Sequence, residues 1–319
     1  MNKEAQDLLR FTSHSEDVLR AIRKNARFKL AIIGVGLIGG SLGLALKDRL
    51  GEQVYITAHA RTAETMELAA KRGACDLATN DLAEVAGDAD IVFLSTPVLQ
   101  MVPMAKKLIP WLKQGAVVTD GGSTKAYIAE ELKGILPAGV SYVAGHPMTG
   151  KEKSGVEAAD KDLFVHHCYV VVRDTGAPEE AVNKIVDLAK TVGSSVTTID
   201  IRKHDRCASL ISHIPHVAAA ALVTLLDRSG DDLSDAMKLA AGGFKDTTRI
   251  ASSNADMWSD ILLTNREAVT GHLESLKGIL DEVIRAVNEG NRGALHEYFA
   301  AAKRRRDIVI AETEKKFDL

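Results

Sequence analysis

Apolar residues in the first two thirds of the chain gather in short runs, and longer stretches with helical spacing separate these runs. Such alternation is typical of parallel strands that are buried on both faces of a sheet and joined by helices. The runs predict seven strands, at 30–33, 54–58, 91–96, 116–120, 142–144, 169–173 and 196–201. The pattern therefore predicts an α/β domain with a doubly wound, mostly parallel sheet over residues 28–200.

The pattern changes after residue 200, because apolar positions then recur every three to four residues to the C-terminus. This spacing predicts an all-helical C-terminal domain over residues 201–319. From Ile261 to Val287 apolar positions recur every three to four residues, which predicts one helix of about 40 Å at 1.5 Å per residue. A helix of this length favours a dimerisation domain, and hence a homodimer, over a core helix of one chain. Residues 1–27 are charged and predict an N-terminal helical leader.

A glycine-rich turn follows the first predicted strand and leads into a helical stretch. In the pattern Gly-x-Gly-x-x-Gly, Gly34 permits a sharp turn, Gly36 lets the backbone approach a pyrophosphate, and Gly39 lets the helix pack on the strand. The helix N-terminus then binds the phosphates. The sequence therefore predicts a Rossmann-type dinucleotide site. Its predicted residues on this turn and at the end of the 91–96 strand are Gly34, Gly36, Leu37, Ile38, Gly39, Ser95, Thr96 and Pro97.

The end of the second predicted strand indicates which nicotinamide cofactor binds. NAD-specific sites usually carry Asp or Glu there to hold the ribose 2′-hydroxyl, whereas this chain has Ala60. Arg61 and Thr62 follow at once, and a guanidinium beside a hydroxyl suits a 2′-phosphate that an acid would repel. The sequence therefore predicts a preference for NADP. NAD remains possible if Arg61 only stacks on the adenine.

Two more predicted strands lead into polar residues, Ser123 and His146. Because parallel strands end at one edge of a sheet, we expect both side chains near the nicotinamide. Histidine titrates at about pH 6.5, so His146 suits the role of general base. A structural histidine before Pro147 is the alternative, but the strand-end position opposite the cofactor loop favours catalysis.

The helical domain adds two pairs of candidate side chains. His213 and His216 can share a helix face, but no third ligand has suitable spacing, so we predict no metal site. Asp246 and Arg249 are i,i+3 neighbours. They form either a surface salt bridge or an arginine fork for a substrate carboxylate that Asp246 orients.

Composition narrows the class of protein. A formal net charge of −3 gives no reason to expect a nucleic-acid partner. No apolar run approaches the roughly 20 residues that span a bilayer, and three scattered cysteines suit a reducing compartment. We therefore expect a cytoplasmic enzyme that acts on a small molecule, without a membrane or nucleic-acid partner.

Taken together, six blocks of this chain resemble the prephenate dehydrogenase family of tyrosine biosynthesis. The blocks are residues 34–41, 122–125, 145–155, 212–216, 242–251 and 257–258. The resemblance implies oxidative decarboxylation of prephenate to 4-hydroxyphenylpyruvate, with hydride transfer to NAD(P)⁺. It also implies a substrate bound between the two domains.

The resemblance assigns roles to residues of this chain. His146 would take the proton of the substrate hydroxyl, and Ser123 would hydrogen-bond that hydroxyl and orient His146. Arg249 would bind a substrate carboxylate, with His216 as a second polar contact. The other implied substrate-site residues are His213, Asp246, Glu152 and Lys151. Lys151 departs from the family, which often has a small or hydroxyl residue there.

Three alternatives to a prephenate dehydrogenase stay open. Arogenate-specific plant relatives contact the substrate ammonium through an acid, and our alignment puts His166 near that position, which favours prephenate over arogenate. A β-hydroxyacid dehydrogenase or imine reductase of similar layout would rely on a lysine rather than His146. A sensor that binds NADP(H) without turnover would need neither a base nor Arg249.

Overall fold

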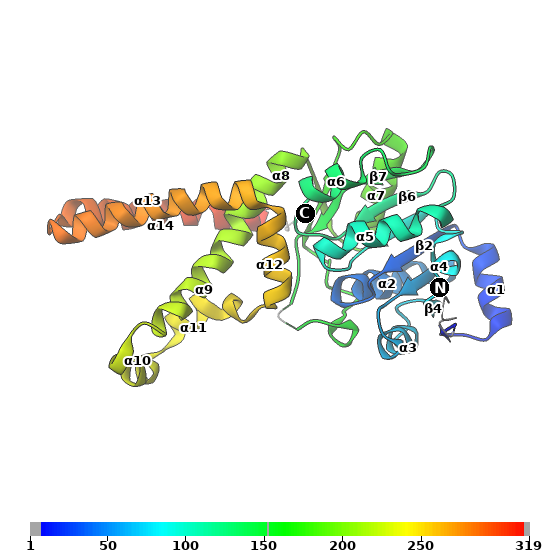
Figure 1. The fold of residues 1–319 in the computed structure, drawn as a ribbon, viewed down its shortest axis with the longest axis horizontal. Coiled ribbons are helices and arrows are strands. Elements are labelled where there is room, and N and C mark those ends of the chain that lie inside the picture. The colour runs from blue at the N-terminus through cyan, green and yellow to red at the C-terminus, as the bar shows by residue number, and fades with distance from the viewer. Residues whose placement is uncertain (1–7, 152, 316–319) are drawn as a thin grey trace, which may run out of the picture. The chain divides into compact units, whose positions relative to one another are not determined.

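The computed structural model describes residues 8–151 and 153–315, which divide into two units (Figure 1). Unit 1 contains the chain up to Asp205 together with Ser252–Thr264, and unit 2 contains Arg206–Ala251 and the residues from Asn265 onward. The sequence analysis set one limit at residue 200. The structure differs because α12 (Ala255–Thr264) packs on α5 (Val98–Leu108) and so joins unit 1.

Unit 1 is built on a seven-stranded sheet with the order β1-β4-β3-β2-β5-β6-β7. Every neighbouring pair is parallel except β1 and β4, which are antiparallel. The predicted doubly wound, mostly parallel sheet is confirmed. The strands are β1 (Arg10–Thr12), β2 (Phe28–Ile33), β3 (Val54–His59), β4 (Leu77–Thr79), β5 (Ile91–Leu94), β6 (Val117–Asp120) and β7 (Ser141–Val143).

Helices cover both faces of this sheet, as the alternation along β2 shows. Leu30 and Ile32 enter one core with α2, α3 and α7, whereas Ala31 and Ile33 enter another with α4, α5 and α6. Both faces of the central strand are therefore buried, which explains its continuous apolar sequence. The helices are α2 (Leu37–Leu50), α3 (Ala63–Lys71), α4 (Leu82–Ala86), α6 (Ala126–Leu132) and α7 (Glu179–Thr191), and short 3₁₀ turns lie at Gly51–Gln53 and Ile109–Trp111.

The described part of the predicted N-terminal leader contains a strand as well as a helix. Helix α1 (Glu16–Asn25) packs Leu19 and Ile22 beside Tyr55 of β3. Before it, β1 extends the edge of the sheet by pairing with β4. The sequence analysis placed neither β1 nor β4, because three residues are too few for an apolar alternation to appear.

A second, smaller sheet contains β8 (Gly145–Pro147), β9 (Cys168–Val172) and β10 (Ser195–Ile199) in the order β10-β9-β8. The prediction that the last two strands extend the large parallel sheet is wrong. A parallel return needs a crossover, usually a helix, and the chain from β8 to β9 has only a 3₁₀ turn at Val156–Ala158 among its described residues. Strand β9 therefore runs antiparallel to β8, whereas β10, reached through α7, is parallel to β9.

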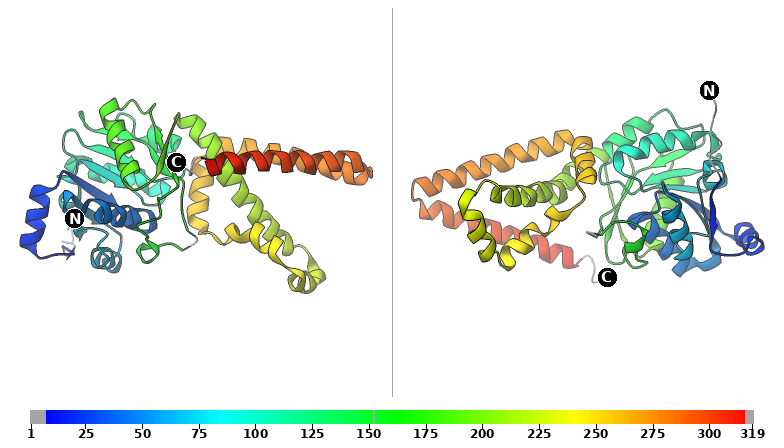
Figure 2. Two further views of the ribbon diagram at one scale, coloured as in Figure 1. Left: turned by 180° about the vertical axis from the view of Figure 1, so that it is seen from behind. Right: turned by 60° about the horizontal axis from the view of Figure 1, so that its bottom comes forward.

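Unit 2 is helical, as predicted (Figure 2). A long helical stretch enters it through α8 (Ile201–Ala208), a π-helical turn (Ser209–His213) and α9 (Ile214–Leu226). Pro215 has no N–H to donate and its ring crowds the preceding turn, which explains the widened turn just before it. The other elements are a 3₁₀ turn at Gly230–Asp232, α10 (Leu233–Leu239), α11 (Gly242–Thr248) and a 3₁₀ turn at Arg249–Ser252.

The helix predicted across 261–287 is two helices. Asn265 leaves the helical conformation, with φ −119° and ψ 34°, and separates α12 from α13 (Arg266–Asn288). A turn through Gly290, at φ +62°, then reverses the chain into α14 (Arg292–Lys315). The orange and red helices of Figures 1 and 2 show α13 and α14 as an antiparallel pair.

Candidate active site

The glycine turn has the geometry of a dinucleotide-binding loop. Gly34 has φ +97°, and a Cβ there would lie 2.8 Å from the backbone of Ser95. The Ser95 hydroxyl donates to the Gly34 carbonyl at 2.7 Å. At Gly36, by contrast, no heavy atom of the described residues lies within 4 Å of a built Cβ. The loop is therefore packed against β5 on one side and open where a pyrophosphate would approach the N-terminus of α2.

The other predicted cofactor residues lie at the same edge of the sheet. Arg61 is exposed just after β3, and Thr62 caps α3 by accepting the N–H of Thr65 at 3.3 Å. After β5, the buried hydroxyl of Thr96 has no hydrogen-bond partner within the described part of the chain. Such a group needs a partner, so the residues present fit a bound dinucleotide.

His146 lies in β8, beside the carboxyl end of β6. A Cβ on Gly145 would lie 2.9 Å from the carbonyl oxygen of Asp120, the last residue of β6. The His146 side chain is 8% exposed, and its Nδ1 lies 2.9 Å from Nε2 of His204. The predicted base is therefore a buried histidine at the expected edge, but it sits within a strand of the second sheet rather than in a loop.

One partner of His146, and the carboxylate behind that partner, are residues that the sequence analysis missed. Nδ1 of His204 lies 2.8 Å from Oδ1 of Asp205, so His146, His204 and Asp205 form a hydrogen-bonded series that we call the buried triad. Their signal was present in α8, where Ile201 and Ala208 mark the inward face and His204 and Asp205 lie on the same face. An acid and a histidine on the inward face of a helix indicate a buried polar contact.

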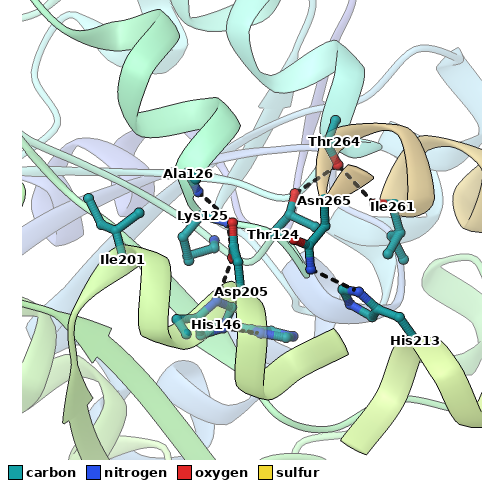
Figure 3. A network of polar contacts seen from close by, with 12 residues as sticks. Thr124, Lys125, Ala126, His146, Ile201, Asp205, His213, Ile261, Thr264 and Asn265 are labelled. Carbon is teal, nitrogen blue, oxygen red and sulfur yellow. Dashed lines mark hydrogen bonds and ion pairs between the residues drawn. The ribbon is translucent and has the colours of Figure 1, made fainter. Parts of the chain in front are cut away.

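Asp205 also anchors the segment that carries Ser123. Its carboxylate accepts the backbone N–H groups of Lys125 at 2.8 Å and Ala126 at 2.9 Å (Figure 3). Ser123 precedes this anchored segment and is half-buried. The structure thus places His204, rather than Ser123, on Nδ1 of His146, and the contact between Ser123 and the substrate hydroxyl stays a prediction.

A buried ion pair lies beside this segment. Lys125 and Asp120 are fully buried and bond to each other, and Nζ of Lys125 also donates to the Gly145 carbonyl at 2.6 Å. Burial lowers the pKa of the Lys125 amine, against the opposing charge of Asp120. Tyr142 donates to Asp120 at 2.7 Å, and its own pKa is raised by burial first and by that carboxylate second.

Four of the predicted substrate residues lie in unit 2. His213 is buried with Nδ1 3.2 Å from Nδ2 of Asn265, and His216 is half-buried with Nδ1 2.9 Å from the Ser212 carbonyl. Burial lowers the pKa of His216, although its backbone hydrogen bond acts in the opposite direction. Asp246 and Arg249 are exposed, in α11 and the 3₁₀ turn after it.

The other predicted substrate-site residues are described only in part. Lys151 is exposed and forms an ion pair with Asp160 at 2.8 Å. Glu152 lies outside the described residues. His166, before β9, is exposed and is the one non-glycine residue with a positive φ, +60°, in the described ranges.

Comparisons with known proteins agree with this geometry. The family model for the prephenate dehydrogenase nucleotide-binding domain matches residues 42–198, and that for the prephenate dehydrogenase dimerization domain matches residues 200–301. A prephenate dehydrogenase of Lactococcus lactis is 34% identical over 284 residues, which cover 88% of this chain and 77% of the relative.

Two solved structures are also similar. Prephenate dehydrogenase of Aquifex aeolicus, in complex with hydroxyphenyl propionate and NAD⁺, gives a TM-score of 0.83 at 32% identity and covers 88% of this chain and 98% of its own. Arogenate dehydrogenase of Synechocystis gives a TM-score of 0.75 at 30% identity, with 88% and 99% covered.

Proposed function

Since this chain belongs to the prephenate dehydrogenase family and is a nicotinamide-dependent dehydrogenase of prephenate or arogenate, we propose that prephenate is its substrate, NADP⁺ its preferred cofactor and His146 its general base. The observation that carries the proposal is the buried, hydrogen-bonded His146 at the carboxyl edge of a Rossmann sheet. In such sheets this edge is where the dinucleotide binds.

The reaction needs one base and a site that positions the ring. Prephenate carries a carboxylate and a hydroxyl on opposite carbons of a cyclohexadiene. The bound nicotinamide supplies the acceptor for the hydride that leaves the hydroxyl-bearing carbon. His146 takes the hydroxyl proton, carbon dioxide leaves with its bonding electrons retained by the ring, and His146 returns the proton to the phenolate oxygen. Aromatisation supplies the driving force, so positioning and proton transfer remain for the protein.

The preference for NADP⁺ rests on the end of β3. Ala60 stands where NAD-specific sites carry an acid, and the exposed Arg61 follows it next to the N-terminus of α3. A guanidinium there binds a 2′-phosphate by charge-assisted hydrogen bonds. Ser123 is assigned to the substrate hydroxyl, and His216, His213, Asp246, Glu152 and Lys151 to the substrate site, on the family resemblance.

The test of this function is the absorbance at 340 nm of the purified protein with prephenate or L-arogenate and NAD⁺ or NADP⁺. We expect the highest kcat/KM with prephenate and NADP⁺. Activity with arogenate alone would keep the mechanism and reject the substrate, and a preference for NAD⁺ would reject the role of Arg61. A folded protein that binds NADPH and turns over in none of the four mixtures would favour the sensor.

Arg249 is assigned to a substrate carboxylate. We expect Arg249→Ala to raise the KM for prephenate by roughly 10- to 100-fold, because a hydrogen bond to a charged group contributes about 1.5–3 kcal/mol. The KM for the cofactor should not change. Arg228→Ala, at another exposed arginine of unit 2, is the matched control. A wild-type KM in Arg249→Ala would remove this residue from the substrate site.

We also propose that the chain forms a homodimer through unit 2, in the cytoplasm. The helical stretch Ile201–Leu226 is long and apolar enough to cross a membrane by length and composition, and only 17% of its most apolar window is buried within the chain. The match to a dimerization domain favours a second copy of the chain as the partner that covers the apolar side chains of this stretch. Light scattering without detergent should give about twice the chain mass of 34.2 kDa, and cell fractionation tests the location.

A further inference from the structure

In the buried triad two hydrogen bonds connect His146 to His204 and His204 to Asp205. The nitrogen that carries the proton in one residue therefore depends on the protonation of its neighbour. The two bonds measure 2.9 Å, between His146 and His204, and 2.8 Å, between His204 and Asp205. The exposed fractions of the three residues are 8%, 3% and 4%. Each bond needs one donor and one acceptor. The state of the innermost group therefore decides which nitrogen of His146 carries a proton.

Asp205, the innermost group, is held as a carboxylate. Burial raises its pKa, but the hydrogen bonds from His204 and from the N–H groups of Ala126 and Lys125 outweigh this, and the pKa lies below its ordinary value. An ionised carboxylate only accepts hydrogen bonds. Each nitrogen that bonds to Asp205 must therefore be a donor, so Nδ1 of His204 carries a proton.

The consequence passes outward to His146. A neutral His204 that donates from Nδ1 presents an acceptor at Nε2, so Nδ1 of His146 must be the donor. His146 then has its lone pair on Nε2. We propose that His204 and Asp205 are positioning residues for the dehydrogenase reaction, which fix His146 in the tautomer whose Nε2 takes the substrate proton. The proposal rests on the proposed role of His146 as the base.

The same carboxylate gives Asp205 a second task. The two N–H groups that it accepts belong to Lys125 and Ala126, which directly follow Ser123 and Thr124. Thr124 is in turn tied to Thr264, the last residue of α12, by a hydroxyl–hydroxyl contact of 2.9 Å. One buried anion therefore holds both the ring that orients the base and the backbone that follows Ser123.

Asp205→Asn tests the proposal, because an amide has nearly the size of the carboxylate but can donate a hydrogen bond. It can therefore exchange the donor and acceptor in both hydrogen bonds of the buried triad. Oδ1 of Asp205 bonds both Nδ1 of His204 and the N–H of Lys125, whereas Oδ2 accepts the N–H of Ala126. When the amide oxygen stays on Ala126, the NH₂ replaces Oδ1 and donates to Nδ1 of His204, and the N–H of Lys125 loses its acceptor. His204 then donates from Nε2, and the proton of His146 moves to Nε2. We expect kcat to fall about 10²- to 10⁴-fold, because His146 then presents a protonated Nε2 and cannot act as the base, while the KM for prephenate and NADPH binding stay unchanged.

Nitrogen-15 NMR of the full-length protein reads the tautomer directly. In the wild type we expect the His146 proton on Nδ1, and in Asp205→Asn on Nε2. Asp174→Asn is the matched control. Asp174 is exposed, and its carboxylate accepts the backbone N–H of Ile201, the first residue of α8, the helix that also carries Asp205. A proton on Nε2 of wild-type His146, or wild-type kcat in Asp205→Asn, would overturn the proposal. The NMR needs no turnover, so it stays readable if the proposed substrate is wrong.

A second pair of variants covers the case in which Asp205→Asn does not fold. The oxygen of His204→Gln can accept the Nδ1 proton of His146, whereas His204→Leu offers no acceptor at similar size. We expect the glutamine variant to retain more kcat than the leucine variant, at equal KM. Equal losses in both would mean that His204 only fills space.

Discussion

Replacing His146 by Asn should lower kcat with prephenate about 10³-fold, within the range of about 10²–10⁴ that general bases contribute. The asparagine NH₂ can still donate to Nε2 of His204, which lies 2.9 Å from Nδ1 of His146. The packing of the site is thereby kept. What is lost is a nitrogen that accepts a proton near neutral pH, since an amide does not.

The loss should fall on kcat and kcat/KM alike, because proton transfer belongs to the transition state rather than to substrate binding. Stopped-flow or steady-state absorbance at 340 nm measures the rate, and fluorescence titration with NADPH measures cofactor binding, which should not change. This combination also separates an enzyme from a sensor, because the same variant would leave a sensor unaffected.

His167→Asn is the matched control for this experiment. His167 lies in the same unit, is exposed, and bonds through Nδ1 to the Val165 carbonyl at 2.9 Å. We expect it to retain full activity. If His146→Asn also turned over at the wild-type rate, another group would have to be the base, and the buried triad would be structural only.

The contrast between His146 and its partners shows how far sequence reasoning reached. The glycine loop and the strand before it could be predicted because their signal is local: an apolar run, three glycines and a helix within one short segment. His146 followed from the rule that parallel strands end at one edge. His204 could not be found in this way, because it lies 58 residues further along the chain.

The errors in the fold have a similar origin. Leu262 and Val269 are two helical turns apart, so their spacing fits one helix even though residues 264–267 between them are all polar. The spacing therefore did not show that Asn265 would break the helix. The second sheet was missed because a strand pattern gives no direction, and the direction of β9 depends on the connection before it. Tertiary contacts, rather than local propensity, decided both.

Lys125→Met should be the most destabilising single change among the described polar contacts that we consider. It leaves Asp120 charged and fully buried without its cation, and breaking a buried pair in this way costs about 3–5 kcal/mol. At about 2–4 °C per kcal/mol for a domain of 150–250 residues, the Tm should fall by roughly 6–20 °C. Calorimetry or circular dichroism measures this shift.

The double variant Lys125→Met with Asp120→Asn tests the cause, since it removes both charges. The amide oxygen can keep the N–H of Gly122, and the NH₂ can donate to the hydroxyl of Tyr142, which can accept as well as donate. The double variant should recover part of the lost Tm. Lys161→Met is the matched control, because Lys161 pairs with Asp48 at 2.8 Å on the surface, where we expect no measurable change.

The ion pair also connects stability to catalysis, because Nζ of Lys125 donates to the carbonyl of Gly145, the residue before His146. If this bond positions the base, Lys125→Met should lose kcat at temperatures where it is still folded, and the double variant should regain Tm without regaining kcat. Recovery of both together would mean that the lysine acts only through the fold. A Tm equal to that of the wild type in the single variant would contradict the assigned cost of the buried charge.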